Sequence, residues 1–296
     1  IMDVRAIAMG LVFAIIWSSA FTSARVIVEY APPLTALALR FLVSGLIGIG
    51  IAAALGQSAR LSRRQWTGVV VFGICQNALY LGMNFVAMQT VEASFAAIIA
   101  STMPLLVALV GWVLLGDRPR PLAIVGLLAG VVGVAIIMGS RLQGHVDPLG
   151  TLLCVLGVVS LTVATLAVRG ATSGGNVLMI VGLQMLVGAA LLAIPAALFE
   201  TFDVTWNWQL GVAFGYTTLF PGLVATVVWF LLVQRIGAVK AATFHFLNPF
   251  FGVAIAAVLL GESLDLLDVL GVVIIAGGIL AVQLSRQSSK PQPTMS

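Results

Sequence analysis

The sequence predicts an all-α integral membrane protein in which about ten transmembrane helices form two inverted five-helix repeats around a central cavity. Three observations support this fold class. Of the 296 residues, 61% are hydrophobic and 8% are charged, whereas a soluble domain carries about 25% charged residues to cover its surface. Ten apolar runs follow one another along the chain, and the second half of the chain repeats features of the first. Most of the protein surface is therefore expected to face lipid.

Each apolar run is long enough to cross the hydrocarbon layer, which takes a helix of about 20 residues. Short links rich in Pro, Gly, Asn, Asp and Arg separate the runs and favour turns. No link is long enough to form a soluble domain of its own, and the alternating pattern of membrane β-strands is absent. The ten predicted spans are residues 6–24, 34–55, 67–88, 93–115, 122–140, 149–168, 176–199, 210–233, 241–260 and 267–285.

The basic residues lie mostly on one side of these spans. Counted from the N-terminus, eleven of the 14 Lys and Arg residues fall on the N-terminal side, Arg25 and Arg141 fall on the opposite side, and Arg40 lies inside the second span. Basic loops stay cytoplasmic, so both termini are expected in the cytoplasm, with residues 286–296 as a polar tail. The basic residues sit in separate short loops, which argues against a nucleic-acid partner.

An internal repeat relates the two halves of the chain at an offset of 144 to 145 residues. Pro104 matches Pro249, and the Leu-Leu-Gly-acid run ending at Asp117 matches the run ending at Glu262. Because five spans is an odd number, the second repeat enters the membrane from the opposite side. Inverted repeats are a common plan of secondary transporters, which open a central site to each side in turn. The predicted repeats are residues 1–140 and residues 141–285.

Prolines inside the spans predict kinks. Proline lacks the N–H that would bond four residues back, so Pro221 frees the carbonyl of Thr217 and Pro249 frees that of His245. These kinks are either hinges or static packing features. Glycines such as Gly126 and Gly271 allow close helix approach; they are expected to pack the scaffold rather than to dimerise it, so a monomer is expected. The candidate hinge residues are Pro104, Pro221, Gly222 and Pro249.

Polar and aromatic side chains inside the spans are the candidates for a substrate cavity, because polar groups in hydrocarbon usually face the bundle interior. Asn77, Tyr80 and Asn84 stand at i, i+3 and i+7, which makes one stripe of an α-helix. For each residue the alternative role is a hydrogen bond between helices, worth about 0.6 kcal/mol. The candidate substrate-binding residues are Trp17, Ser18, Gln76, Asn77, Tyr80, Asn84, Ser101, Gln184, Tyr216, His245 and Asn248.

Two further residue types refine this cavity. Aromatic faces and amides suit a solute with an apolar or aromatic body and a polar end, and Trp17 and Tyr80 are expected to contact its side chain. Tryptophans near span ends, Trp229 among them, are assigned to the interfacial belt. Arg40 either holds a substrate carboxylate or snorkels toward the membrane surface; the structural role is favoured, because the extracellular interface is within reach of its long side chain. Its repeat mate is the neutral Gln184, so no second charge is expected there.

Several short motifs occur in an order that is typical of one family: Trp17-Ser18-Ser19, Pro33 with Arg40, the segment from Ala93-Ser94 through Pro104 to Gly116-Asp117, and its echo through Pro249 to Gly261-Glu262. In these features the chain resembles the drug/metabolite transporter superfamily in its tandem EamA-domain form, over about residues 6 to 285. Within that superfamily it looks most like the bacterial aromatic amino acid exporters (YddG-like). At Asp117 the family more often has Glu. The resemblance implies a multi-pass protein of the bacterial inner (plasma) membrane.

The expected function is secondary export of small amphipathic metabolites, amino acids including aromatic ones, by alternating access. No phosphate-binding loop, metal cluster or catalytic constellation is visible, so no cofactor, metal or enzymatic activity is expected. No acid lies in the middle of a span, and His245 is the one titratable candidate there, which favours facilitated transport. The alternatives are a broad-specificity drug or metabolite efflux carrier, and a channel, although no loop resembles a selectivity filter.

Overall fold

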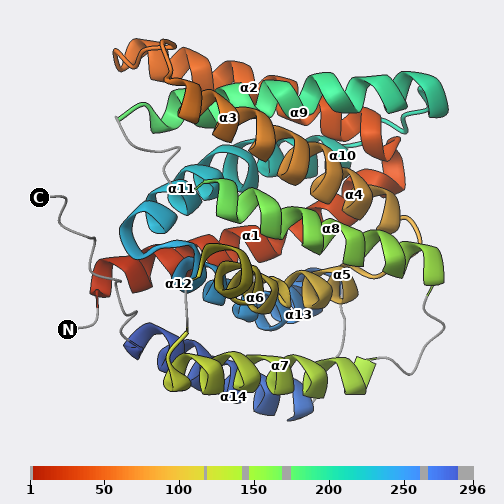
Figure 1. Ribbon diagram of the computed structural model, residues 1–296. Helices are drawn as coiled ribbons and strands as arrows, with labels where there is room; N and C mark the ends of the chain where they lie inside the picture. The colour runs from red at the N-terminus through yellow and green to blue at the C-terminus, as the bar shows by residue number, and fades with distance from the viewer. Residues whose placement is uncertain (1–2, 117–118, 142–146, 169–174, 261–265, 286–296) are drawn as a thin grey trace, which may run out of the picture.

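The computed structural model is a bundle of helices that follows the predicted spans in order (Figure 1). It describes residues 3–116, 119–141, 147–168, 175–260 and 266–285; the predicted tail, Asp117 and Glu262 lie outside these ranges. Six spans are single helices: α1 (Val4–Tyr30), α2 (Pro33–Ala54), α7 (Pro121–Arg141), α8 (Pro148–Ala167), α9 (Val177–Phe199) and α14 (Leu266–Leu284).

The other four spans are divided into segments. The third comprises α3 (Arg63–Phe72), η1 (Gly73–Leu81) and α4 (Gly82–Ala87), and the fourth comprises α5 (Ala93–Ala100) and α6 (Met103–Leu115). The eighth comprises α10 (Trp208–Thr217), η2 (Thr218–Val224) and α11 (Ala225–Ile236). The ninth comprises α12 (Ala238–Ala242), η3 (Thr243–Leu247) and α13 (Asn248–Leu260).

Length and composition confirm the predicted fold class. Within the described residues, seven helices are long and apolar enough to cross a membrane, and three shorter apolar helices complete the series of ten. The same part of the chain contains no strand. In Figure 1, α1 begins and α14 ends at the same end of the bundle, as an even number of spans requires. We call this the proximal end, and the end where α1 stops at Tyr30 the distal end.

Two close helix pairs flank the bundle. Figure 1 shows α2 beside α9 along one edge and α7 beside α14 along the opposite edge, with the other spans between them. Glycine makes both approaches possible: a Cβ on Gly126 would lie 2.5 Å from the Gly278 oxygen, and one on Gly45 would lie 3.0 Å from the Gly182 oxygen. The glycines of α7 and α14 therefore pack the scaffold within one chain.

A carboxylate ties the first pair together at the distal end. The two carboxylate oxygens of Glu200, just after α9, accept the backbone N–H groups of Leu34 and Thr35 at 2.8 and 2.7 Å. These N–H groups belong to the first turn of α2, which has no earlier carbonyl to bond. A negative charge there also complements the helix dipole. Glu200 thus joins the second repeat to the first.

The third and eighth spans each contain a π-helical segment, η1 and η2. A shift of η1 by 144 residues gives residues 217–225, which enclose η2, so the repeat relates the two segments. Pro221 lies inside η2, as its predicted kink requires. η1 contains no proline, and the sequence predicted an ordinary α-helical stripe there. In a π-helix the side chains are rotated away from that spacing, so Asn77, Tyr80 and Asn84 meet different neighbours.

The fourth and ninth spans are interrupted directly before their prolines. Residues 101 and 102 form a turn between α5 and α6, and the 3-10 segment η3 precedes Pro249. The carbonyl of His245, which Pro249 cannot serve, instead accepts the N–H of Asn248. The predicted kinks therefore occur in both repeats. That they act as hinges stays a prediction.

Candidate functional site

Five aromatic rings meet in the middle of the bundle, and we call them the aromatic cluster: Phe13 and Trp17 of α1, Tyr80 of η1, Trp229 of α11 and His245 of η3. The rings of Phe13 and Trp229 stack with centroids 4.8 Å apart, and those of Trp17 and Tyr80 are nearly parallel at 6.3 Å. His245 meets Phe13, Trp17 and Trp229 edge-on at 5.1 to 5.7 Å. Both repeats thus contribute rings to one cluster.

A short hydrogen-bond chain orients His245. Ser18 Oγ donates to Asn248 Oδ1 at 3.1 Å, which turns the amide nitrogen of Asn248 toward His245 Nδ1 at 3.0 Å. Because the amide nitrogen donates, Nδ1 must accept, and the ring proton then sits on Nε2. All three side chains are buried. They come from α1, η3 and the start of α13, so these hydrogen bonds also join the two repeats.

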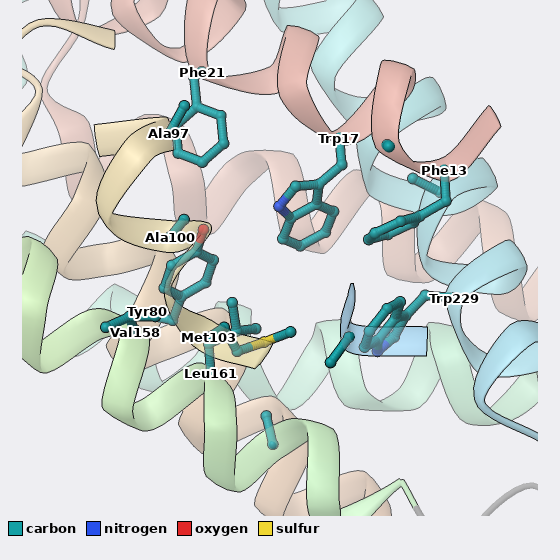
Figure 2. Packing of buried hydrophobic residues seen from close by; sticks show 14 of the residues in the cluster. Phe13, Trp17, Phe21, Tyr80, Ala97, Ala100, Met103, Val158, Leu161 and Trp229 are labelled. Carbon is teal, nitrogen blue, oxygen red and sulfur yellow. The ribbon is translucent and has the colours of Figure 1, made fainter. Parts of the chain in front are cut away.

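Several polar atoms in and beside the cluster lack hydrogen-bond partners among the described residues. They include Trp17 Nε1, Trp229 Nε1, Tyr80 Oη and Asn84 Oδ1, all fully buried. Most buried polar groups in proteins are hydrogen-bonded, so a group of unpaired donors and acceptors in one place indicates a site for a polar ligand. Figure 2 shows the indole nitrogen of Trp17 turned toward Tyr80.

A cavity is bordered by three of these four residues, Trp17, Tyr80 and Asn84. It is lined by Trp17, Phe21, Arg40, Tyr80, Asn84, Phe85, Pro221 and their neighbours. The centre of a water molecule fits over only about 20 Å³ of it, enough for one or two waters. Ligand sites begin at roughly 300 Å³, so the cavity must widen before a metabolite can enter.

A larger hollow opens at the distal end. Its volume is about 610 Å³, and its lining includes the carboxylates of Glu29, Glu200 and Asp203. On α1, Ala24 lines the cavity and Val28 lines the hollow, so about one helical turn separates the two spaces. Repacking of a single helical turn would connect the central cavity with this hollow.

Arg40 borders the cavity from α2 and is only 3% exposed. Its Nε donates to the carbonyl oxygen of Thr217 at 3.1 Å. This oxygen is the one that Pro221 cannot serve. The guanidinium carbon also lies 5.0 Å from the ring centre of Phe41, within range of a cation–π interaction. The structure therefore gives Arg40 a contact inside the bundle in place of snorkelling toward the membrane surface.

Some of the predicted cavity residues lie elsewhere. Asn77 Nδ2 donates to the backbone oxygen of Gln184 at 2.9 Å and to its side-chain oxygen, which closes an interface between η1 and α9. Tyr216 Oη pairs with Ser19 Oγ at 2.6 Å between α10 and α1. Neither pair lines the central cavity. The alternative that the sequence left open for these residues, hydrogen bonding between helices, describes Asn77, Gln184 and Tyr216.

Gln76 and Ser101 are buried, and neither lines the central cavity. Trp17, Tyr80 and Asn84 line that cavity. His245 belongs to the aromatic cluster, and Ser18 and Asn248 orient its ring.

Sequence reasoning missed two members of the aromatic cluster. Trp229 was assigned to the interfacial belt, but it is 2% exposed, whereas Trp206 and Trp208 are 78% and 73% exposed. The assignment is wrong because a position near a span end does not say which side of the helix faces lipid. Phe13 carried a usable signal: it lies one turn before Trp17 and therefore on the same face of α1.

The chemistry of this site is that of binding. No group of three or more His, Cys, Asp or Glu residues that could hold a metal occurs among the described residues. No carboxylate lines the cavity. The lining supplies ring faces, one guanidinium, one indole N–H, one phenol hydroxyl and one amide oxygen, and these groups can orient a solute that has an apolar body and charged or polar ends.

Comparison with known proteins agrees with this geometry. The EamA-like transporter family matches residues 4–139 and again residues 148–284. The chain is 25% identical to the uncharacterized transporter YvbV of Bacillus subtilis, over 93% of this chain and 90% of that protein. It is 26% identical to the uncharacterized inner membrane transporter YedA of Escherichia coli, over 97% and 94%.

A solved crystal structure supports the fold independently. Its TM-score is 0.75 at 24% sequence identity, and the alignment covers 95% of this chain and 96% of that one. At this identity the likeness concerns the fold alone. The two family matches, in contrast, follow one another along the chain and together cover nearly all of it. The protein therefore belongs to the EamA-like transporter family and is a multi-pass membrane transporter.

Proposed function

We propose that the protein is a secondary carrier that exports small amphipathic metabolites, amino acids including aromatic ones, by alternating access. The observation that carries this proposal is the central cavity, where unpaired polar atoms lie against stacked aromatic rings. Aromatic faces bind apolar or aromatic bodies, and the polar atoms fix the orientation of charged ends. The cavity is lined by residues of the first repeat and by Pro221 of the second, and secondary transporters with inverted repeats bind their substrates near the contact of the two repeats.

Alternating access requires the cavity to widen toward one side at a time. The repeat-related segments supply places where this can happen, because η1, η2 and η3 and the turn at residues 101–102 interrupt the regular helices around the cavity. Bends at such interruptions leave the straight helix pairs, α2 with α9 and α7 with α14, as rigid supports. We infer that Pro104, Pro221, Gly222 and Pro249 mark the positions of these hinges.

We further propose that the carrier runs down the gradient of its own solute. His245 is enclosed by three aromatic rings and its Nδ1 is engaged by Asn248. A proton relay usually uses membrane carboxylates, and none lines the cavity. Solute accumulation in sealed vesicles driven by a pH difference alone would contradict this part of the proposal. We also propose that the carrier is a monomer in a bacterial inner membrane and that both of its termini lie in the cytoplasm.

Broad efflux of drugs and apolar metabolites is the second candidate. An apolar hollow of about 310 Å³ lies between α2 and α10, lined by Leu39, Val43, Trp206 and Phe214 among others. Such a hollow beside the bundle favours solutes that partition into lipid. It is separate from the central cavity, so a purely apolar solute would not need the polar atoms there.

Counterflow in proteoliposomes tests the proposal against this rival. Vesicles loaded with one unlabelled compound are mixed with a trace of labelled compound outside, using amino acids, sugars and cationic drugs in turn. We expect saturable counterflow with L-phenylalanine and related amino acids and none with sugars. Counterflow of cationic drugs alone would support the second candidate, and flux that neither saturates nor exchanges would indicate a channel.

A further inference from the structure

We propose that Arg40 binds the carboxylate of the transported solute and that Asn84 accepts a hydrogen bond from its ammonium group, so that the cavity selects zwitterionic amino acids. This inference rests on the proposed function and adds to it the two residues that read the charged ends of the solute. It depends on the placement of two buried side chains that line the same cavity.

Arg40 is a buried cation without an acidic partner. Two of the described acids have partners of their own at helix ends: Asp3 pairs with Arg235, and Glu200 caps α2. Within the same part of the chain, no ion pair joins Arg40 to a carboxylate. A charge held away from water is costly unless an opposite charge and hydrogen bonds compensate it. An anionic group of the solute is the compensation that the cavity can admit.

The guanidinium is fixed in place with its free end on the cavity. Nε is occupied by the oxygen of Thr217 at 3.1 Å, and the structure gives the two Nη nitrogens no hydrogen-bond partner among the described residues. The side chain lines the cavity together with Trp17 and Tyr80. Arginine presents its donors in a rigid planar fork that matches a carboxylate. The bond to Thr217 already restricts this long side chain. Less conformational entropy is therefore lost when a carboxylate binds.

Asn84 offers the opposite kind of group. Its Nδ2 donates to the backbone oxygen of Tyr80 at 2.8 Å, which fixes the amide orientation and leaves Oδ1 buried without a partner in a residue that lines the cavity. An amide oxygen only accepts hydrogen bonds, so it suits an ammonium group. Asn84 is 1% exposed. The cavity therefore holds one cationic donor and one neutral acceptor, beside the parallel rings of Trp17 and Tyr80.

Three related probes separate the two ends of the solute. L-phenylalanine has both charged groups, 2-phenylethylamine lacks the carboxylate, and 3-phenylpropionate lacks the ammonium group. Binding of each to purified protein is measured by calorimetry, with Arg40→Gln and Asn84→Leu as variants. Ser44→Ala is the matched control, because Ser44 Oγ also bridges α2 to η2, by a 2.8 Å bond to the oxygen of Thr218, but does not line the cavity.

We expect Arg40→Gln to lower the affinity for L-phenylalanine and for 3-phenylpropionate by about 10- to 100-fold, the usual effect of losing a charge-assisted hydrogen bond. Binding of 2-phenylethylamine should change by less than about threefold. Asn84→Leu should lower the affinity for L-phenylalanine and for 2-phenylethylamine, and it should leave the affinity for 3-phenylpropionate unchanged. The wild-type protein and Ser44→Ala should give the same ratio of affinities for L-phenylalanine and 2-phenylethylamine.

The ratio of affinities keeps the test valid even if Arg40→Gln is less stable. A purely structural role for Arg40 would weaken all three probes alike, leave the ratio as in the wild type, and overturn the inference while the proposed function stands. If the wild-type protein bound none of the probes, both the proposed function and this inference would fail.

Discussion

In one half of the molecule a guanidinium joins α2 to the end of α10 beside the π-helical segment η2, and in the other half a pair of amides joins α9 to η1. Arg40 Nε donates to the oxygen of Thr217, the last residue of α10, whereas Asn77 Nδ2 donates to both oxygens of Gln184. The repeat relates the two interfaces, since Gln184 stands 144 residues after Arg40 and Pro221 stands 144 residues after Asn77. The two interfaces are equivalent in the fold and different in chemistry.

The difference shows what the fold itself requires. Pro221 has no N–H for the oxygen of Thr217. The π-helical register of η2 brings the N–H five residues on to such an oxygen instead, and Arg40 adds a further donor. A neutral side chain could do the same, as the amide pair at η1 shows. The charge of Arg40 is thus more than the helix interface needs, and this interface is also the one that borders the cavity. We infer that the η2 interface serves both packing and the solute, whereas the η1 interface serves packing.

The largest expected loss of stability comes from overpacking the interface between α9 and η1. A Cβ on Gly188 would lie 2.4 Å from the Cβ of Asn77, so Gly188→Val should destabilise the protein by about 2 kcal/mol. The measurement is the midpoint of thermal unfolding in one detergent. Gly215→Val is the control, because no atom lies within 4 Å of the Cβ position at Gly215. Equal midpoints for the two variants would show that α9 and η1 are not packed as described.

The next effect removes the amide pair. Asn77→Leu deletes both hydrogen bonds to Gln184 and should cost about 1 kcal/mol, within the range of hydrogen bonds between membrane helices. Because Asn77 does not line the cavity, the ratio of affinities for L-phenylalanine and 2-phenylethylamine should stay as in the wild type. A changed ratio would place the η1 interface in the solute site and remove the distinction between the two regions.

A smaller loss of stability is expected from a variant that weakens the interface between α2 and η2 and leaves the charge of Arg40 in place. Ser44→Ala deletes the hydrogen bond to Thr218 and should cost about 0.6 kcal/mol. Thermal unfolding and counterflow of L-phenylalanine are measured on the same preparation. We expect a slightly lower midpoint and an unchanged KM. A raised KM with this variant would mean that any loosening of α2 against η2 disturbs the solute, and the effect of Arg40 would then need no direct contact.

The smallest effect concerns a contact between the repeats outside the spans. Arg235 donates to both oxygens of Asp3, at 2.5 and 3.1 Å. Arg235 and then the N–H of Ala6 hold the pKa of Asp3 below its ordinary value near 3.8. A lowered carboxyl pKa contributes stability above the unfolded pKa, and this contribution is lost as the pH falls through the folded pKa.

Asp3→Asn should therefore lower the unfolding midpoint slightly at pH 7, since exposed ion pairs contribute little. The variant and the wild type should converge below about pH 4. A difference that grew on acidification would contradict this sign. A fall as large as that of Gly188→Val would contradict the view that the interfaces inside the spans dominate stability.

Much of this architecture could be predicted from the sequence, because the responsible physics is local or periodic. Span length and composition indicated ten helices, and proline indicated the kinks near Pro104, Pro221 and Pro249. The repeat offset indicated that Arg40 and Gln184 are equivalent. Buried polar residues were recognisable because polar groups inside apolar runs must face the bundle interior.

The rest depends on how helices rotate against one another. η1 contains no proline, so the sequence gives no sign of a π-helical segment there. Asn77, Tyr80 and Asn84 were therefore expected on one face of an α-helix. The π-helical segment turns Asn77 toward α9 and Tyr80 toward α1. Trp229 was misplaced for a similar reason, since only packing decides whether a residue near a span end faces lipid or Phe13.

The proposed solute site lies against the rings of Trp17 and Tyr80. The most direct test is the KM of L-phenylalanine counterflow for Trp17→Ala and Tyr80→Ala, with the exposed Trp208→Ala as the matched control and with size-exclusion profiles to confirm folding. We predict that both cavity variants raise KM by about tenfold or more and that Trp208→Ala leaves it unchanged. Wild-type KM values in all three variants would show that the aromatic cluster is a packing feature and that the solute binds elsewhere.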